Sequence, residues 1–257
     1  MFDVGNFQGL RKGNFAKEFY YFETLESTML GAAELAAQGV AEGCVVLANQ
    51  QTAGRGRKDR TWFSPGDLNL YFSVVLRPPT PLLHFIPFLA SLALHRALQG
   101  LAIEADLKWP NDVLVGRKKI AGILMQTSVE QEVLHHAILG IGINVNVRSF
   151  PAELAPVATS IALETGAPAA RESVLASILL EFERPYEKIS ELGWRDLSAD
   201  LERRSTYLRS CPVRVRENGR VLEGITAGLD EYGGLIVETE TGRQIVYAGD
   251  VESCRKE

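Results

Sequence analysis

Apolar and polar positions in the first 50 residues indicate two short strands joined by a helix. Residues 17–27, KEFYYFETLES, are rich in the aromatic and β-branched side chains that favour strands. Ser27 and Thr28 suit a helix N-cap, and the TMLGAAELAAQ segment predicts a helix that Gly39 ends. Residues 44–48 are a short apolar run that predicts a buried strand.

A third strand and a long helix are predicted next. Residues 68–76 are strongly apolar and end before prolines at 78, 79 and 81. Residues 82–98 then carry apolar side chains at 82, 85, 86, 89, 92, 93 and 97, which is the spacing of one helix face. We expect this helix to pack across one face of a sheet.

The middle of the chain has a different pattern, in which strands alternate with short turns. Residues 105–147 read as strand, turn, strand several times over. Such neighbours are expected to be antiparallel, because a parallel crossover needs about a dozen residues or more, and the pattern is not that of a Rossmann fold. Residues 171–190 have an apolar helical face, and Pro185 is expected to kink or divide that helix.

Residues 211–251 read as four or five short strands separated by NG, YGG and TG turns. We predict an SH3-like β-barrel there, and the alternative is a β-sheet extension of the main domain. The chain as a whole is predicted to be an α+β protein. A mixed, largely antiparallel sheet flanked by helices would occupy residues 1–209, and the small barrel would occupy residues 210–257.

Composition limits the functional classes. The chain has 257 residues, 46% hydrophobic and 23% charged, as in an ordinary globular protein. No apolar run approaches the roughly 20 residues of a bilayer span, and the N-terminus lacks the apolar core of a secretion signal, so we expect a cytoplasmic protein that does not bind membranes. Cys44, Cys211 and Cys254 lack CxxC spacing, which favours reduced thiols over disulfides or a zinc site.

Charge points to a small anionic ligand. The net charge is −5, from 27 basic and 32 acidic residues, so nucleic acid is repelled by the molecule as a whole. About twenty residues before Tyr20 read as irregular and too short for a helix-turn-helix. Sequence-specific DNA binding is therefore not expected.

Positive charge is concentrated in one loop, within NQQTAGRGRKDRTWFSPGDLNLYFSVVL at 49–76. Four cations stand within six positions of this loop: Arg55, Arg57, Lys58 and Arg60. Glycines at 54, 56 and 66 give the backbone freedom to close, and Trp62 could stack on a purine while guanidinium groups bind phosphate oxygens. The alternative is a solvated basic hairpin loop.

Several common site types are absent from the sequence. There is no GxxxxGK[ST], no complete GxGxxG, no GxSxG and no HExxH. His135 and His136 would point to opposite faces of a strand, so a shared metal ion is not expected and a structural role is favoured.

Four segments together resemble the biotin protein ligase family. They are GRGRKDRTWFSPGDLNLYFS from Gly54, KWPND at 108–112, KIAGIL at 119–124 and GIGINVN at 140–146. The similarity extends over most of residues 20–147 and more faintly through the C-terminal strands. It implies a catalytic domain like those of class II aminoacyl-tRNA synthetases and biotin synthetases, and the monofunctional type without an N-terminal DNA-binding domain.

The resemblance implies a two-step reaction. Biotin and MgATP give biotinyl-5′-AMP and pyrophosphate, and a lysine of a biotin carboxyl carrier protein then attacks the mixed anhydride. The Mg²⁺ is expected to arrive with ATP, with no protein ligand assigned. A lipoyl or octanoyl ligase is the alternative within enzymes, and a non-catalytic biotin-binding or carrier-docking module is the alternative outside them.

Site residues are carried over by their place in the motifs. Lys119 and Arg55 are expected to be catalytic. Biotin would be bound by Ser27, Thr28, Met29, Gln51, Arg55, Gly56, Arg57, Lys119, Gly122, Gly140 and Gly142. ATP and the adenylate would be bound by Arg55, Arg57, Arg60, Trp62, Lys108, Asn111 and Asn144, with Trp62 covering the adenine.

Two departures from the family pattern stand in the site. Met29 replaces the usual asparagine of Ser-Thr-Asn and removes an amide that could bond a ligand, while Asp59 replaces a glycine and adds a negative charge to the cationic loop. The loop from Gly54 to Gly66 is expected to be mobile without ligand. Exposed edge strands within residues 105–147 could support a weak homodimer, so the chain is expected to be a monomer or a weak homodimer.

Overall fold

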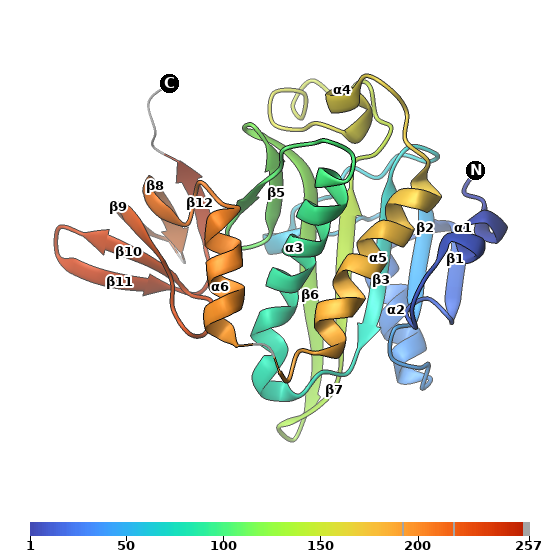
Figure 1. The fold of residues 1–257 in the computed structure, drawn as a ribbon, viewed down its shortest axis with the longest axis horizontal. Coiled ribbons are helices and arrows are strands. Elements are labelled where there is room, and N and C mark those ends of the chain that lie inside the picture. Colours follow the sequence, from blue (N-terminus) through green and yellow to red (C-terminus); the bar gives the residue numbers. More distant parts are fainter. Residues whose placement is uncertain (192, 218, 254–257) are drawn as a thin grey trace.

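The computed structural model describes residues 1–191, 193–217 and 219–253. Within this part of the chain a large sheet carries helices on both faces, and a smaller C-terminal sheet lies beside it (Figure 1). Asn218 of the expected NG turn and Cys254 fall outside the described residues. Cys44 and Cys211 are both buried, and burial, more than neighbouring charges, raises the pKa of the Cys44 thiol to about 11.

In the described part of the chain, the large sheet has seven strands in the order β1-β2-β3-β7-β6-β5-β4. Their bounds are β1 (Phe19–Leu25), β2 (Val45–Gln51), β3 (Leu70–Leu76), β4 (Asp106–Lys108), β5 (Asp112–Val115), β6 (Lys118–Glu130) and β7 (Val133–Ile143). β1 and β2 are parallel, and the other neighbouring strands of this sheet pair antiparallel. The strands predicted from the sequence, and the antiparallel pairing of residues 105–147, are confirmed.

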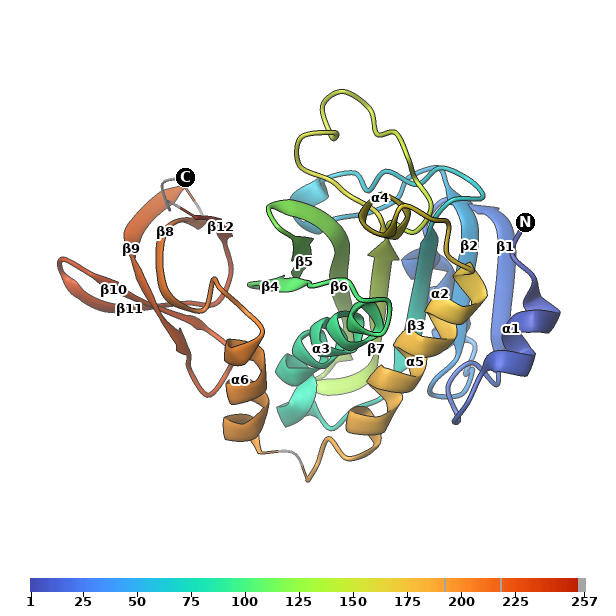
Figure 2. The ribbon, with the colours of Figure 1, turned by 45° about the horizontal axis from the view of Figure 1, so that its top comes forward.

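The alternation of side chains along the strands explains the two layers of helices. Val46 faces α2 (Thr28–Ala37), whose Met29 packs into the same small cluster. Val45 and Leu47 point the other way, into the main core under α3 (Ile86–Gln99) and α5 (Arg171–Glu187). Figure 2 shows α3 and α5 side by side over that face.

The N-terminal residues are not irregular, contrary to the sequence-based expectation. They form α1 (Val4–Leu10), which begins where the Asp3 side chain accepts a hydrogen bond from Asn6 N at 2.9 Å. Phe7 of α1 is fully buried, with its ring centroid 4.7 Å from that of Phe19 on β1. Docking of aromatic side chains on the edge strand therefore stabilises a helix whose own sequence contains two glycines.

Pro185 does not divide the second long helix. α5 continues past it to Glu187, so the proline stands in the last turn. A 3-10 turn, η2 (Thr80–Phe85), precedes α3, and the described residues also form η1 (Arg57–Asp59), α4 (Ile161–Thr165) and α6 (Trp194–Arg203).

The helical segment Thr80–Gln99 corrects the expectation that no apolar run approaches the length of a membrane span. It has 20 residues and a mean hydropathy of 1.3, which are sufficient by length and composition alone. However, 67% of it is buried inside the protein. It is the core helix predicted to pack across the sheet.

The C-terminal sheet has five antiparallel strands in the described residues, in the order β11-β10-β9-β8-β12. These are β8 (Arg209–Glu217), β9 (Arg220–Leu229), β10 (Leu235–Thr239), β11 (Gly242–Val246) and β12 (Asp250–Ser253). The predicted small β-structure is confirmed. It docks on the main domain through the Trp109 indole N–H, which donates to Gly233 O at 2.9 Å, so β12 is brought to the cationic loop.

Candidate functional site

Two adjoining cavities lie beside the cationic loop: the larger one extends to the C-terminal sheet, and the smaller one lies between the start of α2 and strands β6 and β7. The larger has a volume of about 420 Å³ and the smaller about 50 Å³. The residues that line both cavities are Gly56, Arg57, Trp62, Asn111 and Lys119. These shared walls make the two cavities parts of one site.

The far end of the smaller cavity is polar and preorganised. Ser27 caps α2 by accepting a hydrogen bond from Met29 N at 3.3 Å, and Gln51 Oε1 accepts one from Thr28 N at 2.9 Å. The Ser73 hydroxyl donates to Thr28 Oγ1 at 2.9 Å. Ser27 and Thr28 are buried, so this end offers fixed hydroxyl and amide groups to a ligand.

The floor of the smaller cavity consists of glycines on β6 and β7. Gly122 and Gly142 are paired across the two strands, and Gly140 is paired with Leu124. A Cβ placed on any of the three glycines would stand 2.6 to 2.9 Å from another side chain. Glycine is needed here because other side chains already lie directly on the strands.

Those covering side chains are themselves site residues. The Met29 sulfur would be 2.8 Å from a Cβ at Gly140, and Trp62 Nε1 would be 2.6 Å from one at Gly142. The Trp62 indole therefore lies on the floor of the smaller cavity, while also lining the larger one. Met29, which replaces an amide in the family pattern, contributes a thioether to an apolar cluster below α2.

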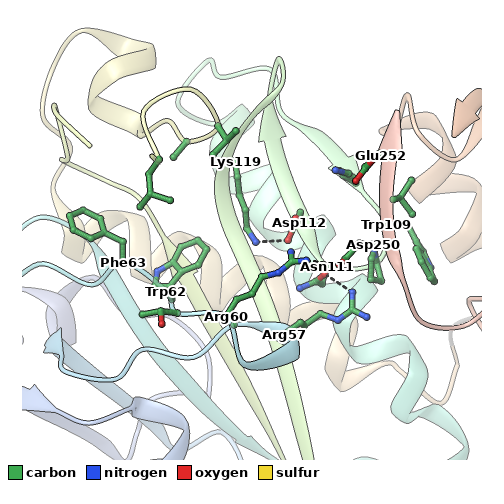
Figure 3. A pocket seen from close by; sticks show the side chains of 18 of the residues that line it. Arg57, Arg60, Trp62, Phe63, Trp109, Asn111, Asp112, Lys119, Asp250 and Glu252 are labelled. Atoms are coloured by element: carbon green, nitrogen blue, oxygen red, sulfur yellow. Dashed lines mark hydrogen bonds and ion pairs between the residues drawn. The ribbon is translucent and has the colours of Figure 1, made fainter. Parts of the chain in front are cut away.

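Lys119 stands where the two cavities meet. Its ammonium is 2.6 Å from Asp112 Oδ1 and 5.1 Å from the centroid of the Trp62 ring. Figure 3 shows Lys119 and Asp112 pointing toward one another above the cationic loop. Both side chains are less than one-third exposed, at 31% and 27%, so solvent weakens this ion pair only in part.

The cationic loop is folded against the C-terminal sheet. Within the loop, Gly56 N donates to Arg60 O at 2.7 Å, and Lys58 has a left-handed φ of 54°. Lys58 Nζ is 3.3 Å from Asp250 Oδ2, and Arg60 pairs with the same carboxylate. The side chain of Asp59 lies outside the described part of the loop, so the effect of this departure from the family pattern stays a prediction.

Asp250 thus joins β12 to the cationic loop, and we call its two ion pairs with Lys58 and Arg60 the Asp250 clamp. Burial alone would raise the pKa of Asp250, but hydrogen bonds and positive charge from Lys58 and Arg60 hold it below its ordinary value. The carboxylate is therefore charged at neutral pH. A second contact joins the same elements, because Arg57 donates to Gly249 O at 3.3 Å and to Asn111 Oδ1 at 3.2 Å.

Three of the remaining predicted residues, Lys108, Asn111 and Asn144, line the larger cavity, whereas Arg55 lines the smaller one. Asn111 donates to Ile123 O at 2.8 Å, and buried Asn144 donates to Thr159 O at 2.9 Å, so both amides are fixed by main-chain contacts. The ammonium of Lys108 lies 5.6 Å from the Tyr207 ring centroid. Arg55 is more exposed and lies 3.7 Å from Glu26.

The larger cavity combines cations with an apolar wall. Phe63 of the cationic loop packs against Phe150 on this wall, with ring centroids 6.3 Å apart. Leu154 and Val157 extend this wall. Such a lining suits an anionic ligand that carries a flat ring. His135 and His136 line neither cavity.

The structure brings the sequence-predicted residues together. The smaller cavity is lined by Ser27, Thr28, Met29, Gln51, Arg55, Gly56, Arg57, Lys119, Gly122, Gly140 and Gly142. The larger is lined by Arg57, Arg60, Trp62, Lys108, Asn111 and Asn144, whereas Arg55 lines only the smaller of the two. Their individual roles stay predictions.

Sequence reasoning missed several lining residues. Asp112 belongs to the KWPND motif, which was the available signal, but its contact with Lys119 depends on strand pairing. Asp250 and Phe150 have no such signal, because each reaches the site through tertiary packing.

Comparison with known proteins gives consistent matches. Residues 21–144 match the model of the biotin/lipoate A/B protein ligase family, and residues 212–252 match that of the biotin protein ligase C terminal domain. The chain is 36% identical over 250 residues to the bifunctional ligase/repressor BirA of Bacillus spizizenii, covering 95% of this chain and 76% of that protein.

Two further relatives agree over almost their full length. The chain is 33% identical to the biotin–[acetyl-CoA-carboxylase] ligase of Paracoccus denitrificans, covering 88% of this chain and 96% of the relative. Among solved structures, the biotin protein ligase from Aquifex aeolicus in complex with biotin and ATP has a TM-score of 0.80 at 30% identity. That match covers 93% of this chain and 100% of the other.

Proposed function

This chain belongs to the biotin protein ligase family, and from that premise we propose that its two cavities hold biotin and ATP during one reaction. The protein is an ATP-dependent ligase that forms biotinyl-5′-AMP and passes biotin to a carrier protein lysine. The observation that carries this proposal is the position of Lys119. It stands between a small cavity with a fixed polar end and a larger cavity lined with cations.

Biotin would occupy the smaller cavity with its ureido ring at the polar end. Ser27, Thr28 and Gln51 there can donate to and accept from the ring's N–H and C=O groups. The valeryl tail would run over the glycine floor toward Lys119. The carboxylate then lies at the junction of the cavities, where it must meet the α-phosphate.

The first chemical step joins two anions. A biotin carboxylate oxygen attacks the α-phosphorus and pyrophosphate leaves. Arg55, Arg57 and Lys119 would offset the repulsion and stabilise the charge that develops on the oxygens. In the second step the carrier lysine amine attacks the acyl carbon, AMP leaves, and an amide forms.

The larger cavity would hold the adenylate. Arg60 and Lys108 can pair with phosphate oxygens, while Asn111 and Asn144 offer amides held in fixed positions. We propose that Trp62 covers the adenine during the reaction. The apolar wall formed by Phe63 and Phe150 is also suited to a purine ring.

Mg²⁺ is proposed to arrive with ATP. The described residues contain no group of three or more His, Cys, Asp or Glu side chains that could hold a metal ion. Asp112 and Asn111 place oxygen atoms on the wall of the larger cavity, and Mg²⁺ is usually held by one or two such groups together with substrate phosphates. The ion would neutralise phosphate charge there.

The finer assignments are proposals as well. We propose that residues 1–209 are the catalytic domain and that residues 210–257 are the C-terminal domain. The proposed acceptor is a biotin carboxyl carrier protein of a biotin-dependent carboxylase, and the proposed location is the cytoplasm.

β5 pairs with β6 only as far as Gly122, so in the described structure residues 124–130 of β6 have a strand on one side alone. Sheet extension at this edge could give a weak homodimer, which light scattering at several concentrations would detect.

Biotin-dependent exchange of pyrophosphate into ATP tests the function directly. Exchange with biotin, and little with octanoate or lipoate, is the expected result. Preference for octanoate or lipoate would identify the alternative ligase. Biotin uptake without any exchange would indicate a binding module.

Loss of the Asp250 clamp is expected to loosen the cationic loop. In Asp250→Ala, Lys58 and Arg60 lose their shared partner, so tryptic cleavage within the loop should accelerate about tenfold without ligand. Biotin plus MgATP should slow the cleavage, because phosphate would replace the lost carboxylate. Glu252→Ala is the matched control, since Glu252 lies on the same strand but pairs with Arg216. Equal cleavage of both variants would contradict the clamp.

Sequence-specific DNA binding is not expected, with or without biotin. The net charge of −5 opposes nonspecific attraction to phosphates, and the cations of the loop are engaged at the site. Electrophoretic mobility shifts on a panel of duplexes measure this. A shift on a defined site that is stimulated by biotin and resists salt would contradict the prediction.

A further inference from the structure

The smaller cavity is already filled by one of the protein's own side chains. Its remaining volume of about 50 Å³ is well below the roughly 300 Å³ of a typical small-molecule site. The Trp62 indole takes up that space, because its ring atoms stand over Gly142 and Gly122. A ligand that lies along the glycine floor needs the same volume.

The Trp62 indole has one unfavourable and one favourable interaction in this position. The indole N–H is buried and has no hydrogen-bond partner. An unpaired buried donor is costly, whereas Trp109 donates its indole N–H to a carbonyl. The Lys119 ammonium lies over the Trp62 ring at 5.1 Å and provides the compensating attraction.

We propose that Trp62 is a built-in occupant of the biotin pocket that biotin must displace, and that this displacement delivers the indole to the adenine side of the site. The inference rests on the proposed function. Trp62 lines both cavities, so a rotation at the loop moves the ring from one to the other. The incoming carboxylate would also draw the Lys119 ammonium away from the ring and from Asp112.

The proposal predicts opposite effects on two steps for one substitution. Trp62→Ala empties the smaller cavity, so biotin should associate about tenfold faster than with the unsubstituted protein, since the binding-competent fraction is no longer limited by the plugged state. The same variant loses the ring proposed to stack on adenine, so biotinyl-5′-AMP formation should fall. A merely structural tryptophan would slow both steps.

Stopped-flow association of biotin, without ATP, is the measurement. With the unsubstituted protein the observed rate should level off at high biotin, because ring displacement becomes limiting, and with Trp62→Ala it should rise linearly. Trp62→Phe, with a smaller ring, should fall between them. Phe63→Ala removes a neighbouring ring of the same loop that faces Phe150, and so tests whether loop loosening alone speeds binding.

Each outcome decides between the proposals. If the unsubstituted protein binds no biotin and exchanges no pyrophosphate, the proposed function fails. If it binds biotin, but Trp62→Ala associates no faster or Phe63→Ala gains as much, the displaced-tryptophan proposal is wrong while the function stands.

Discussion

Lys119→Ala is expected to slow biotinyl-5′-AMP formation by roughly 10² to 10³ at saturating biotin and MgATP, because one donor aimed at developing charge is worth that much in a water-poor site. The ammonium is positioned by a rigid strand and lies at the junction of the two cavities. Part of its interaction with the carboxylate and α-phosphate should strengthen only in the transition state. The defect should therefore appear in the rate at saturation and not only in substrate affinity.

Folding should change little in this variant. The ion pair with Asp112 is partly exposed, so its loss should cost about 1 kcal/mol or less of unfolding free energy. Lys118→Ala is the matched control, since Lys118 is exposed and the neighbouring strand position points to the opposite face. Similar adenylation rates for the two variants, measured by quench of single turnovers, would show that Lys119 is not the catalytic lysine.

Elements with strong local patterns were predictable from the sequence. A run of four aromatic residues, 19–22, favours strand β1, and the Ser27 cap with the alanine-rich segment after it specifies α2. Short turns specify the antiparallel strands β5, β6 and β7. In each case the signal and the structure depend on the same few neighbouring residues.

Elements stabilised by distant packing were not predictable in the same way. α1 contains two glycines in seven residues and depends on Phe7 docking against β1. α4 has five residues, too few for a periodic pattern. α6 does carry a helical signal in the sequence, because Leu197 and Leu201 are four positions apart, and both are buried in the structure. The signal is weak, because the ten residues of α6 contain few other apolar positions.

The site residues also differ in how far they could be predicted: those in local motifs could be, and those brought in by distant packing could not. Motif residues such as Lys119 and Gly142 could be assigned because the strands that carry them have a recognisable order. Asp250 could not, since its contact with Arg60 joins residues 190 positions apart. The position of the Trp62 ring could not be predicted from the sequence either. A stacking role for this residue does not show which of the two cavities its ring occupies when no ligand is bound.

The glycine floor leads to a second large expected effect. Gly142→Ala should weaken biotin binding roughly 10- to 10²-fold, which corresponds to the 1–3 kcal/mol of an overpacked site. A Cβ at Gly142 would stand 2.6 Å from the atoms that now occupy the cavity, and biotin is proposed to take that same volume. The new methyl group would also displace the Trp62 indole. It would itself stand in the volume that the indole leaves, so biotin could not lie along the glycine floor.

The fold should tolerate this change, which lets binding be separated from stability. Gly142 pairs with Tyr71 and Gly122 in regular antiparallel strands and is not among the glycines with positive φ. Gly9→Ala in α1 is the control, because Gly9 lines neither cavity and an added Cβ there meets no atom within 4 Å. Titration calorimetry with biotin, alongside thermal melts, should show weak binding only for Gly142→Ala. If that variant binds biotin as tightly as Gly9→Ala does, the ligand does not lie along this floor, and the placement of biotin in the smaller cavity is wrong.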